Sequence, residues 1–245
     1  MKIFITGDST AAKKELNKRP ETGWGEKLYK YLNEPIEIIN VAQNGRSTKS
    51  FLNENRLSDI IPLFEKGDYL FIQFGHNDGK IKDPARFTEP FGEYQENLKI
   101  FINSAREKGV IPVIFSSVSR RKFLEDGSLD PKAVEDYPQA ALELAKKENV
   151  VSLDLFTATQ KLYTYLGEDL SRKLFVQLKP TDSKNYPEGK EDNTHFCDLG
   201  AKMIASLVSE SILNSSLEFK NKIDSTKILT QKEIKEELEK KYLYE

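Results

Sequence analysis

Short, continuous runs of apolar and β-branched residues recur along the chain at fairly even intervals. They predict strands at residues 2–6, 36–41, 69–74, 111–115 and 150–153. Runs of this kind are typical of a parallel sheet that helices cover on both faces.

Between these runs the apolar residues follow a helical spacing. This spacing predicts helices at residues 24–32, 58–64, 94–108 and 138–148. Strand and helix therefore alternate, which favours an α/β fold with about five parallel strands in a βαβ series.

After the fifth strand the pattern predicts a helix at residues 156–166, a polar segment that leads to His195, and a helix at residues 198–213. No linker, repeat or low-complexity tract divides the chain up to this point. Residues 1–215 are therefore predicted to form one domain.

Residues 216–245 form a charged extension with as many Lys residues as Asp and Glu residues. Thr230 and Glu233 have the spacing of a capping box at the start of a helix. An apolar stripe follows at every fourth position: Ile234, Leu238 and Tyr242. We expect this helix to pack on its own domain rather than on a partner.

The composition narrows the function classes. Hydrophobic residues make up 38% of the chain, enough for a core, and the net charge of −2 gives no global attraction to nucleic acid or to an anionic membrane. No apolar run is long enough to span a membrane, and no charged-then-apolar leader precedes the first strand. With Met1 at the start, these features predict a cytoplasmic protein; the oligomeric state is left open.

Polar clusters follow four of the predicted strands, at the point where each strand ends. They are Gly7-Asp8-Ser9-Thr10, Asn44-Gly45-Arg46-Ser47, Gly75-His76-Asn77-Asp78 and Ser119-Arg120. The carboxyl ends of parallel strands share one edge of a sheet, so these residues are expected to converge there, where α/β folds collect ligands.

Each cluster also has a structural interpretation when it is taken alone. Ser9 and its neighbours can cap a helix, Gly45 can be a turn glycine, and His76 can be a hydrogen-bonded structural histidine. Asp192 and His195 can belong to an Asx turn. The complete set favours a site over these separate explanations.

The set has the chemistry of a serine hydrolase. A serine hydroxyl becomes a nucleophile when a histidine removes its proton, and that histidine needs a carboxylate to orient it. Ser9, His195 and Asp192, which lies three residues before His195, are the candidates. The Ser9 and Gly45 backbone N–H groups and the Asn77 amide are the candidate oxyanion donors.

The ordered blocks resemble those of the SGNH (GDSL-type) hydrolase superfamily, whose four naming residues match Ser9, Gly45, Asn77 and His195. The resemblance covers residues 1 to about 213 and implies a flavodoxin-like three-layer α/β/α sandwich with a Ser-His-Asp triad. It does not explain the charged extension.

Three longer segments, residues 45–51, 73–78 and 186–196, look like the rhamnogalacturonan acetylesterase branch. This implies a serine esterase that removes acetyl groups from pectic oligosaccharides. The candidate substrate-binding residues are His76, Arg46, Lys49, Arg120 and Tyr186, of which the cations can meet galacturonate carboxylates. The polar stretch 178–191 is expected to form one wall of the site.

Other chemistries lack their motifs. No dinucleotide-binding G-x-G-x-x-G, P-loop or G-x-S-x-G elbow occurs, and two distant histidines with one cysteine, Cys197, do not predict a zinc site. We therefore expect no cofactor and no metal. Two alternatives stay open: a broader carboxylesterase, lysophospholipase or thioesterase on the same scaffold, and a carbohydrate-binding relative with a decayed site.

Overall fold

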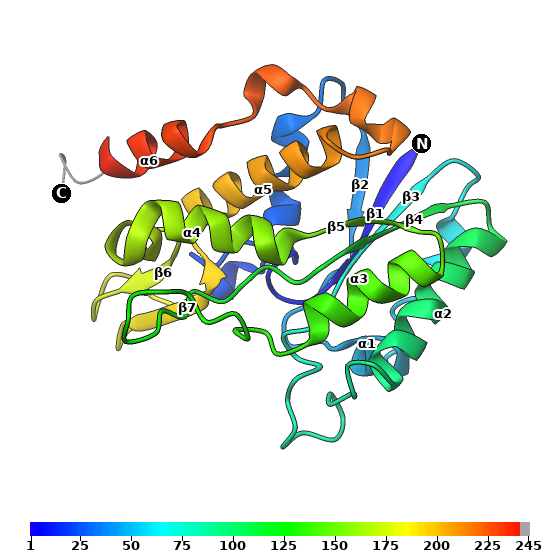
Figure 1. Cartoon of the computed structure of the whole chain (residues 1–245), viewed down its shortest axis with the longest axis horizontal. Helices are drawn as coiled ribbons and strands as arrows, with labels where there is room; N and C mark the ends of the chain where they lie inside the picture. The colour runs from blue at the N-terminus through cyan, green and yellow to red at the C-terminus, as the bar shows by residue number, and fades with distance from the viewer. Residues whose placement is uncertain (241–245) are drawn as a thin grey trace.

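Five parallel strands form the centre of the computed structural model, which describes residues 1–240 (Figure 1). The strand order is β2-β1-β3-β4-β5. Their bounds are β1 Lys2–Gly7, β2 Glu37–Asn40, β3 Tyr69–Gln73, β4 Ile111–Phe115 and β5 Val151–Leu153. Each predicted strand is present, with ends that differ by two residues or fewer.

Side chains alternate between two hydrophobic cores, one on each face of the sheet. In β1, Ile3 and Ile5 enter one core, and Phe4 enters the other. Because successive side chains of a strand point to opposite faces, a run that is buried throughout needs a cover on both sides.

Helices supply that cover (Figure 1). On one face lie α4 and α5, and on the other lie α1, α2 and α3. Their bounds are α1 Thr48–Asn53, α2 Glu93–Glu107, α3 Tyr137–Lys147, α4 Leu155–Arg172 and α5 Asp198–Leu213. This confirms the predicted α/β sandwich with five parallel strands.

Two predicted helices are wrong. The segment 24–32 forms two short 3-10 turns, Trp24–Glu26 and Leu28–Tyr31, and only Ile61–Leu63 of the segment 58–64 is helical. Pro62 explains the second error because it has no N–H to donate to the carbonyl of residue 58.

The polar segment before His195 contains a strand pair that the sequence pattern does not predict. β6 (Phe175–Leu178) and β7 (Lys190–Phe196) form a separate two-stranded antiparallel sheet. Six of the seven residues of β7 are polar, so β7 has no hydrophobic alternation that would identify it.

The described part of the extension packs on the domain. Helix α6 (Gln231–Lys240) begins at the predicted capping box, where Thr230 N–H donates to Glu233 and Glu233 N–H donates to Thr230 Oγ1. Ile234 and Leu238 are fully buried and belong to the same core as α4 and α5. Tyr242, the third predicted stripe residue, lies outside the described residues. Among residues 1–240, the helices are all too short or too polar to cross a membrane.

Candidate active site

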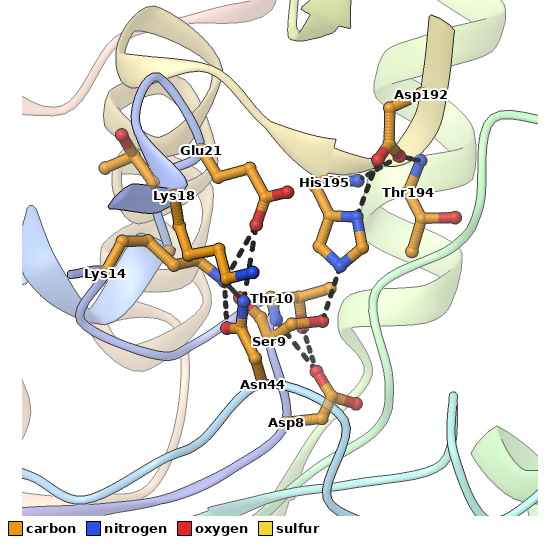
Figure 2. Close-up of polar contacts among 12 residues, drawn as sticks. Asp8, Ser9, Thr10, Lys14, Lys18, Glu21, Asn44, Asp192, Thr194 and His195 are labelled. Atoms are coloured by element: carbon orange, nitrogen blue, oxygen red, sulfur yellow. Dashed lines mark hydrogen bonds and ion pairs between the residues drawn. The ribbon is translucent and has the colours of Figure 1, made fainter. Parts of the chain in front are cut away.

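Ser9 lies in a tight turn at the carboxyl end of β1 (Figure 2). The turn is not the start of a helix: the Ala11 and Ala12 N–H groups donate to the Asp8 carbonyl, and the chain then turns away. Asp8 Oδ1 accepts from Thr10 N–H at 2.9 Å and from Thr10 Oγ1 at 2.8 Å. These bonds fix the backbone on both sides of the Ser9 hydroxyl.

The segment that was predicted as a helix holds this turn from the other side. Trp24 N–H donates to the Thr10 carbonyl at 2.9 Å. Gly23 packs so closely on the backbone of Ala11 and Ala12 that a Cβ atom would overlap it. This close approach accounts for the 3-10 turns, since the segment follows the shape of the Ser9 turn.

His195 and Asp192 both come from β7. His195 Nδ1 is 2.7 Å from Asp192 Oδ2, and Asp192 Oδ1 accepts the backbone N–H groups of Thr194 and His195 at 2.8 Å each. In a regular strand, side chains three residues apart point to opposite faces. The predicted proximity therefore requires an irregular strand.

A bulge in β7 supplies the irregularity. The strand pairing moves from Gln177–Glu191 to Phe175–Phe196, so β7 advances by five residues while β6 advances by two. The extra residues of β7 lie between Glu191 and Phe196, where the two site residues are. β-Bulges commonly redirect side chains beside active sites.

Ser9 completes a Ser-His-Asp geometry with these residues (Figure 2). His195 Nε2 is 2.9 Å from Ser9 Oγ. With Nδ1–H donating to Asp192, Nε2 can accept the serine proton. Burial raises the pKa of Asp192, but the hydrogen bond and charge of His195 and the two backbone N–H groups outweigh burial and hold it below its usual range. Asp192 is therefore ionised at neutral pH.

Two neighbouring residues fix the orientation of the Asn77 side-chain amide. Its Nδ2 donates to the Arg46 carbonyl at 3.1 Å, and its Oδ1 accepts from Arg86 Nη1 at 3.3 Å. The second Nδ2 hydrogen remains for a ligand. The contact with Arg46 also places Asn77 beside Gly45, whose φ of +77° suits glycine.

His76 is buried and its Nδ1 lies 3.1 Å from Asp8 Oδ2. Its Nε2 has no protein partner among the described residues. Burial opposes ionisation of Asp8, but the charge and hydrogen bond of His76 and the bonds from Thr10 lower the pKa of Asp8. The structure thus places a second Asp–His pair beside the nucleophile turn.

The segments that follow β1, β3 and β4 enclose a pocket of about 380 Å³ together with β7. Every residue that lines it is polar: Ser9, His76, Asn77, Lys80, Arg120, Glu191, Asp192, Asn193, Thr194 and His195. His76 and Arg120 are thus the candidate substrate-binding residues that the structure brings to the triad.

The other candidates do not line this pocket, and their role in substrate binding stays a prediction. Arg46 pairs with Glu54, and Lys49 pairs with Glu93. Tyr186 is not among the pocket-lining residues. Of the polar stretch 178–191, only Glu191 lines the pocket, while the neighbouring Lys190 contacts Asp192.

The sequence assigns no site role to four charged residues near the triad: Lys14, Glu21, Lys190 and Arg86. Lys190 lies in the segment 186–196, but neither that segment nor the loops that carry the other three show which charged side chains contact the site. Glu21, Asp192 and His195 also form a cluster whose ligand-type atoms lie within 4.8 Å of one another. Lys190 Nζ contacts both carboxylates and Lys14 Nζ lies 3.9 Å from Glu21, so two cations of the chain face the two carboxylates.

Comparisons with known proteins agree with this geometry. The sequence profile of the GDSL-like lipase/acylhydrolase family matches residues 3–208. The chain is 40% identical to rhamnogalacturonan acetylesterase RhgT of Bacillus subtilis, over 92% of this chain and 95% of that protein. It is 36% identical to the probable rhamnogalacturonan acetylesterase YesY of the same organism, over 86% of this chain and 91% of that protein.

A solved structure has the same fold. The crystal structure of the Bacillus subtilis protein YxiM superimposes with a TM-score of 0.72 at 25% sequence identity, over 86% of this chain and 55% of that chain.

Proposed function

The chain belongs to the GDSL-like lipase/acylhydrolase family, and we propose that it is a serine esterase that removes acetyl groups from acetylated rhamnogalacturonan-type oligosaccharides. The similarity to two proteins named for that activity supports the proposal, since it extends over most of the chain. The triad geometry supports the reaction type.

In the proposed reaction, Ser9 Oγ attacks the acetyl carbonyl carbon while His195 Nε2 takes the hydroxyl proton. The tetrahedral intermediate collapses, the sugar oxygen leaves, and His195 returns the proton to it. Water then attacks the carbonyl carbon of the acetyl-serine while His195 takes its proton. The bond between that carbon and Ser9 Oγ breaks, acetate leaves, and His195 returns the proton to Ser9 Oγ. Asp192 stays ionised and stabilises the imidazolium of each intermediate.

The oxyanion of each tetrahedral intermediate needs hydrogen-bond donors. The second hydrogen of Asn77 Nδ2 and the backbone N–H groups of Ser9 and Gly45 are the groups that we assign to it. Arg86 supports Asn77, because its bond to Oδ1 prevents the amide from rotating.

The polar lining of the pocket is the single observation that carries the substrate class. A long acyl chain gains about 0.8 kcal/mol for each buried CH₂ group, and this requires an apolar groove. No apolar residue lines the pocket. A short acetyl group on a polyhydroxylated sugar matches such a pocket, because the sugar hydroxyls need hydrogen-bond partners.

Two cations of the pocket favour an acidic sugar. Arg120 donates only to backbone carbonyls, those of His76 and Ala133, and Lys80 forms no ion pair within residues 1–240. Their charges are therefore available to the carboxylates of galacturonate units.

Acetate release from acetylated rhamnogalacturonan oligosaccharides, compared with hydrolysis of an acyl-chain-length series of simple esters, tests the proposal. We expect release from the oligosaccharides and little activity on acyl chains longer than about four carbons, because each further CH₂ finds no apolar surface to bury. A preference for chains of eight carbons or more would instead support the lipase-like alternative.

A further inference from the structure

The hairpin that carries His195 and Asp192 has no strand hydrogen bonds to the main sheet. Ser9, in contrast, follows β1, an inner strand of the main sheet. The main sheet therefore does not by itself fix the distance between nucleophile and base, and other contacts must hold β7 in place.

Besides the backbone bond from Thr22 N–H to the Phe196 carbonyl, a chain of alternating charges links β7 to the Ser9 loop. Figure 2 shows the part of this chain that contains Lys14 and Glu21. Lys14 Nζ donates to the Ser9 carbonyl, and it lies 3.9 Å from Glu21 Oε2. Glu21 Oε1 accepts from Lys190 Nζ at 2.5 Å, and Lys190 Nζ lies 3.2 Å from Asp192 Oδ2. With the bonds of His195, this chain forms a closed ring from the Ser9 backbone to the Ser9 hydroxyl.

Glu21 is also a second carboxylate beside the catalytic base. It lies in the cluster with Asp192 and His195, its side chain is 5% exposed, and it does not line the pocket. Burial opposes its ionisation, but Lys190, His195 and Tyr186 lower the pKa of Glu21. A buried negative charge at this distance acts on the histidine through a poorly screened medium.

Lys190 brings the opposite charge to the same place. Burial opposes its charged form, but Glu21 and Asp192 raise the pKa of Lys190. Without a partner, this cation would weaken the hold of Asp192 on the imidazolium that forms when His195 takes a proton. Glu21 cancels that effect.

We propose that Glu21 and Lys190 are positioning residues that act as one unit: Lys190 clamps Asp192 and the hairpin to the Ser9 loop, and Glu21 neutralises the charge of Lys190 near His195. The proposal rests on the proposed function for its kinetic consequence only. The electrostatic effect of the two charges on the imidazole does not depend on the reaction.

The titratable groups around His195 come from three parts of the fold. Lys190, Glu191 and Asp192 belong to β7, and Lys14 and Glu21 belong to the loop after β1. Across the pocket lie His76, Lys80 and Arg120. The variants that test the charge balance differ from wild type only at Glu21 and Lys190, so the other groups are the same in each comparison.

An NMR titration of the His195 ring tests the charge balance directly. The chain has two histidines, and a His76→Asn variant assigns their signals. We expect the midpoint of His195 to move to lower pH in Glu21→Gln, because the cluster then loses one negative charge while Lys190 keeps its positive charge. It should move to higher pH in Lys190→Met, by about half a unit to one unit in each case.

The double variant Glu21→Gln/Lys190→Met should return the midpoint close to the wild-type value. The matched control is Glu15→Gln, the same change at an exposed position of the same loop, which should leave the midpoint unchanged. Midpoints that stay fixed in both single variants, or move in the same direction, would overturn the proposal.

A second experiment measures kcat and KM on a small acetyl ester. Glu21→Gln should lower kcat by about tenfold, the equivalent of one pH unit, with little change in KM because Glu21 does not line the pocket. Lys190→Arg, which keeps the charge, should retain more activity than Lys190→Met. A Glu21→Gln variant that raises KM alone would contradict the assignment.

The NMR titration and the kinetic measurement distinguish failure of the charge proposal from failure of the proposed function. Wild-type protein without esterase activity would refute the function, yet the opposite NMR shifts would still be observed if the charge unit exists. A variant that fails to fold is recognised by its thermal unfolding curve, and Lys190→Arg then carries the comparison with wild type.

Discussion

Ser9 and His195 are 186 positions apart in the chain, and their side chains meet at 2.9 Å. We expect Ser9→Ala to fold normally and to lose activity by several orders of magnitude, because no acyl-enzyme can form. Ester hydrolysis and mass spectrometry after a serine-directed phosphonate measure this. Ser58→Ala, an exposed serine, is the control. More than about a tenth of wild-type turnover in Ser9→Ala would refute the assignment.

Asn77, unlike Ser9, is expected to act by donating a hydrogen bond to the oxyanion of the tetrahedral intermediate. Asn77→Ala should lower kcat by about 10²–10³-fold with little change in KM, as loss of one oxyanion donor does. Asn77→Asp keeps the acceptor for Arg86 but removes the donor, and it should be at least as impaired. Steady-state kinetics distinguish this from a binding role, in which KM alone would rise.

The loss of activity in His76→Ala should be smaller than the loss in His195→Ala.

Asp78 shows how the site region depends on pH. Burial raises the pKa of Asp78 from 3.8 to about 7, although bonds from Thr48 and Thr88 partly offset it. A folded-state pKa above the unfolded one favours folding at low pH, and this contribution is lost as pH rises from about 4 to 7.

Asp78→Asn should therefore be more stable than wild type by a margin that grows from pH 4 to pH 7 and then stays constant. The difference should be on the order of 1–4 kcal/mol. Urea unfolding at several pH values measures it, with Asp59→Asn as an exposed control. A margin that does not vary between pH 4 and 7 would contradict the raised pKa.

At the scale of elements, the sequence predicts the strands and helices whose hydrophobic residues recur with a regular period. Strands such as Tyr69–Gln73 and helices such as Asp198–Leu213 bury regular apolar faces, so their positions follow from the pattern. Ser9 and Asn77 are predicted because they lie in short motifs after predicted strands, and Asp192 is predicted from its position three residues before His195.

The elements that the sequence does not predict are held by tertiary contacts. β7 is polar and is defined by its pairing with β6 and by its bulge, neither of which leaves a local pattern. Glu21 and Lys190 are 169 residues apart, and their contact is visible only once the loop and the hairpin are in place. Arg46 and Tyr186 do not line the pocket, because side-chain direction depends on packing, and their contact with the substrate stays a prediction.

Helix α6 allows an element-scale prediction. Ile234 and Leu238 are buried in the core beside α4, and no residue of α6 lines the pocket. Each substitution to Ala should lower the free energy of unfolding by about 2–5 kcal/mol, with kcat of the folded enzyme unchanged. Lys232→Ala, on the exposed face, is the control. Wild-type stability in both variants would show that the extension does not contribute to the fold.

At the scale of the whole molecule, the charges nearly cancel, with a net charge of −2. A polyanionic pectic substrate is therefore not attracted by the protein as a whole, and its binding depends on the local cations Lys80 and Arg120 of the pocket. These cations are within reach of solvent, so salt screens them.

This predicts a substrate-dependent effect of salt and of charge. KM for an acidic acetylated oligosaccharide should rise with NaCl concentration, and Arg120→Gln should raise it by about tenfold, the equivalent of one hydrogen bond to a charged group. Hydrolysis of a neutral acetyl ester should change much less in both experiments. Lys82→Gln, an exposed cation outside this pocket, is the matched control. Equal effects of Arg120→Gln on the acidic and neutral substrates would place Arg120 in the support of the site rather than in recognition of the carboxylate.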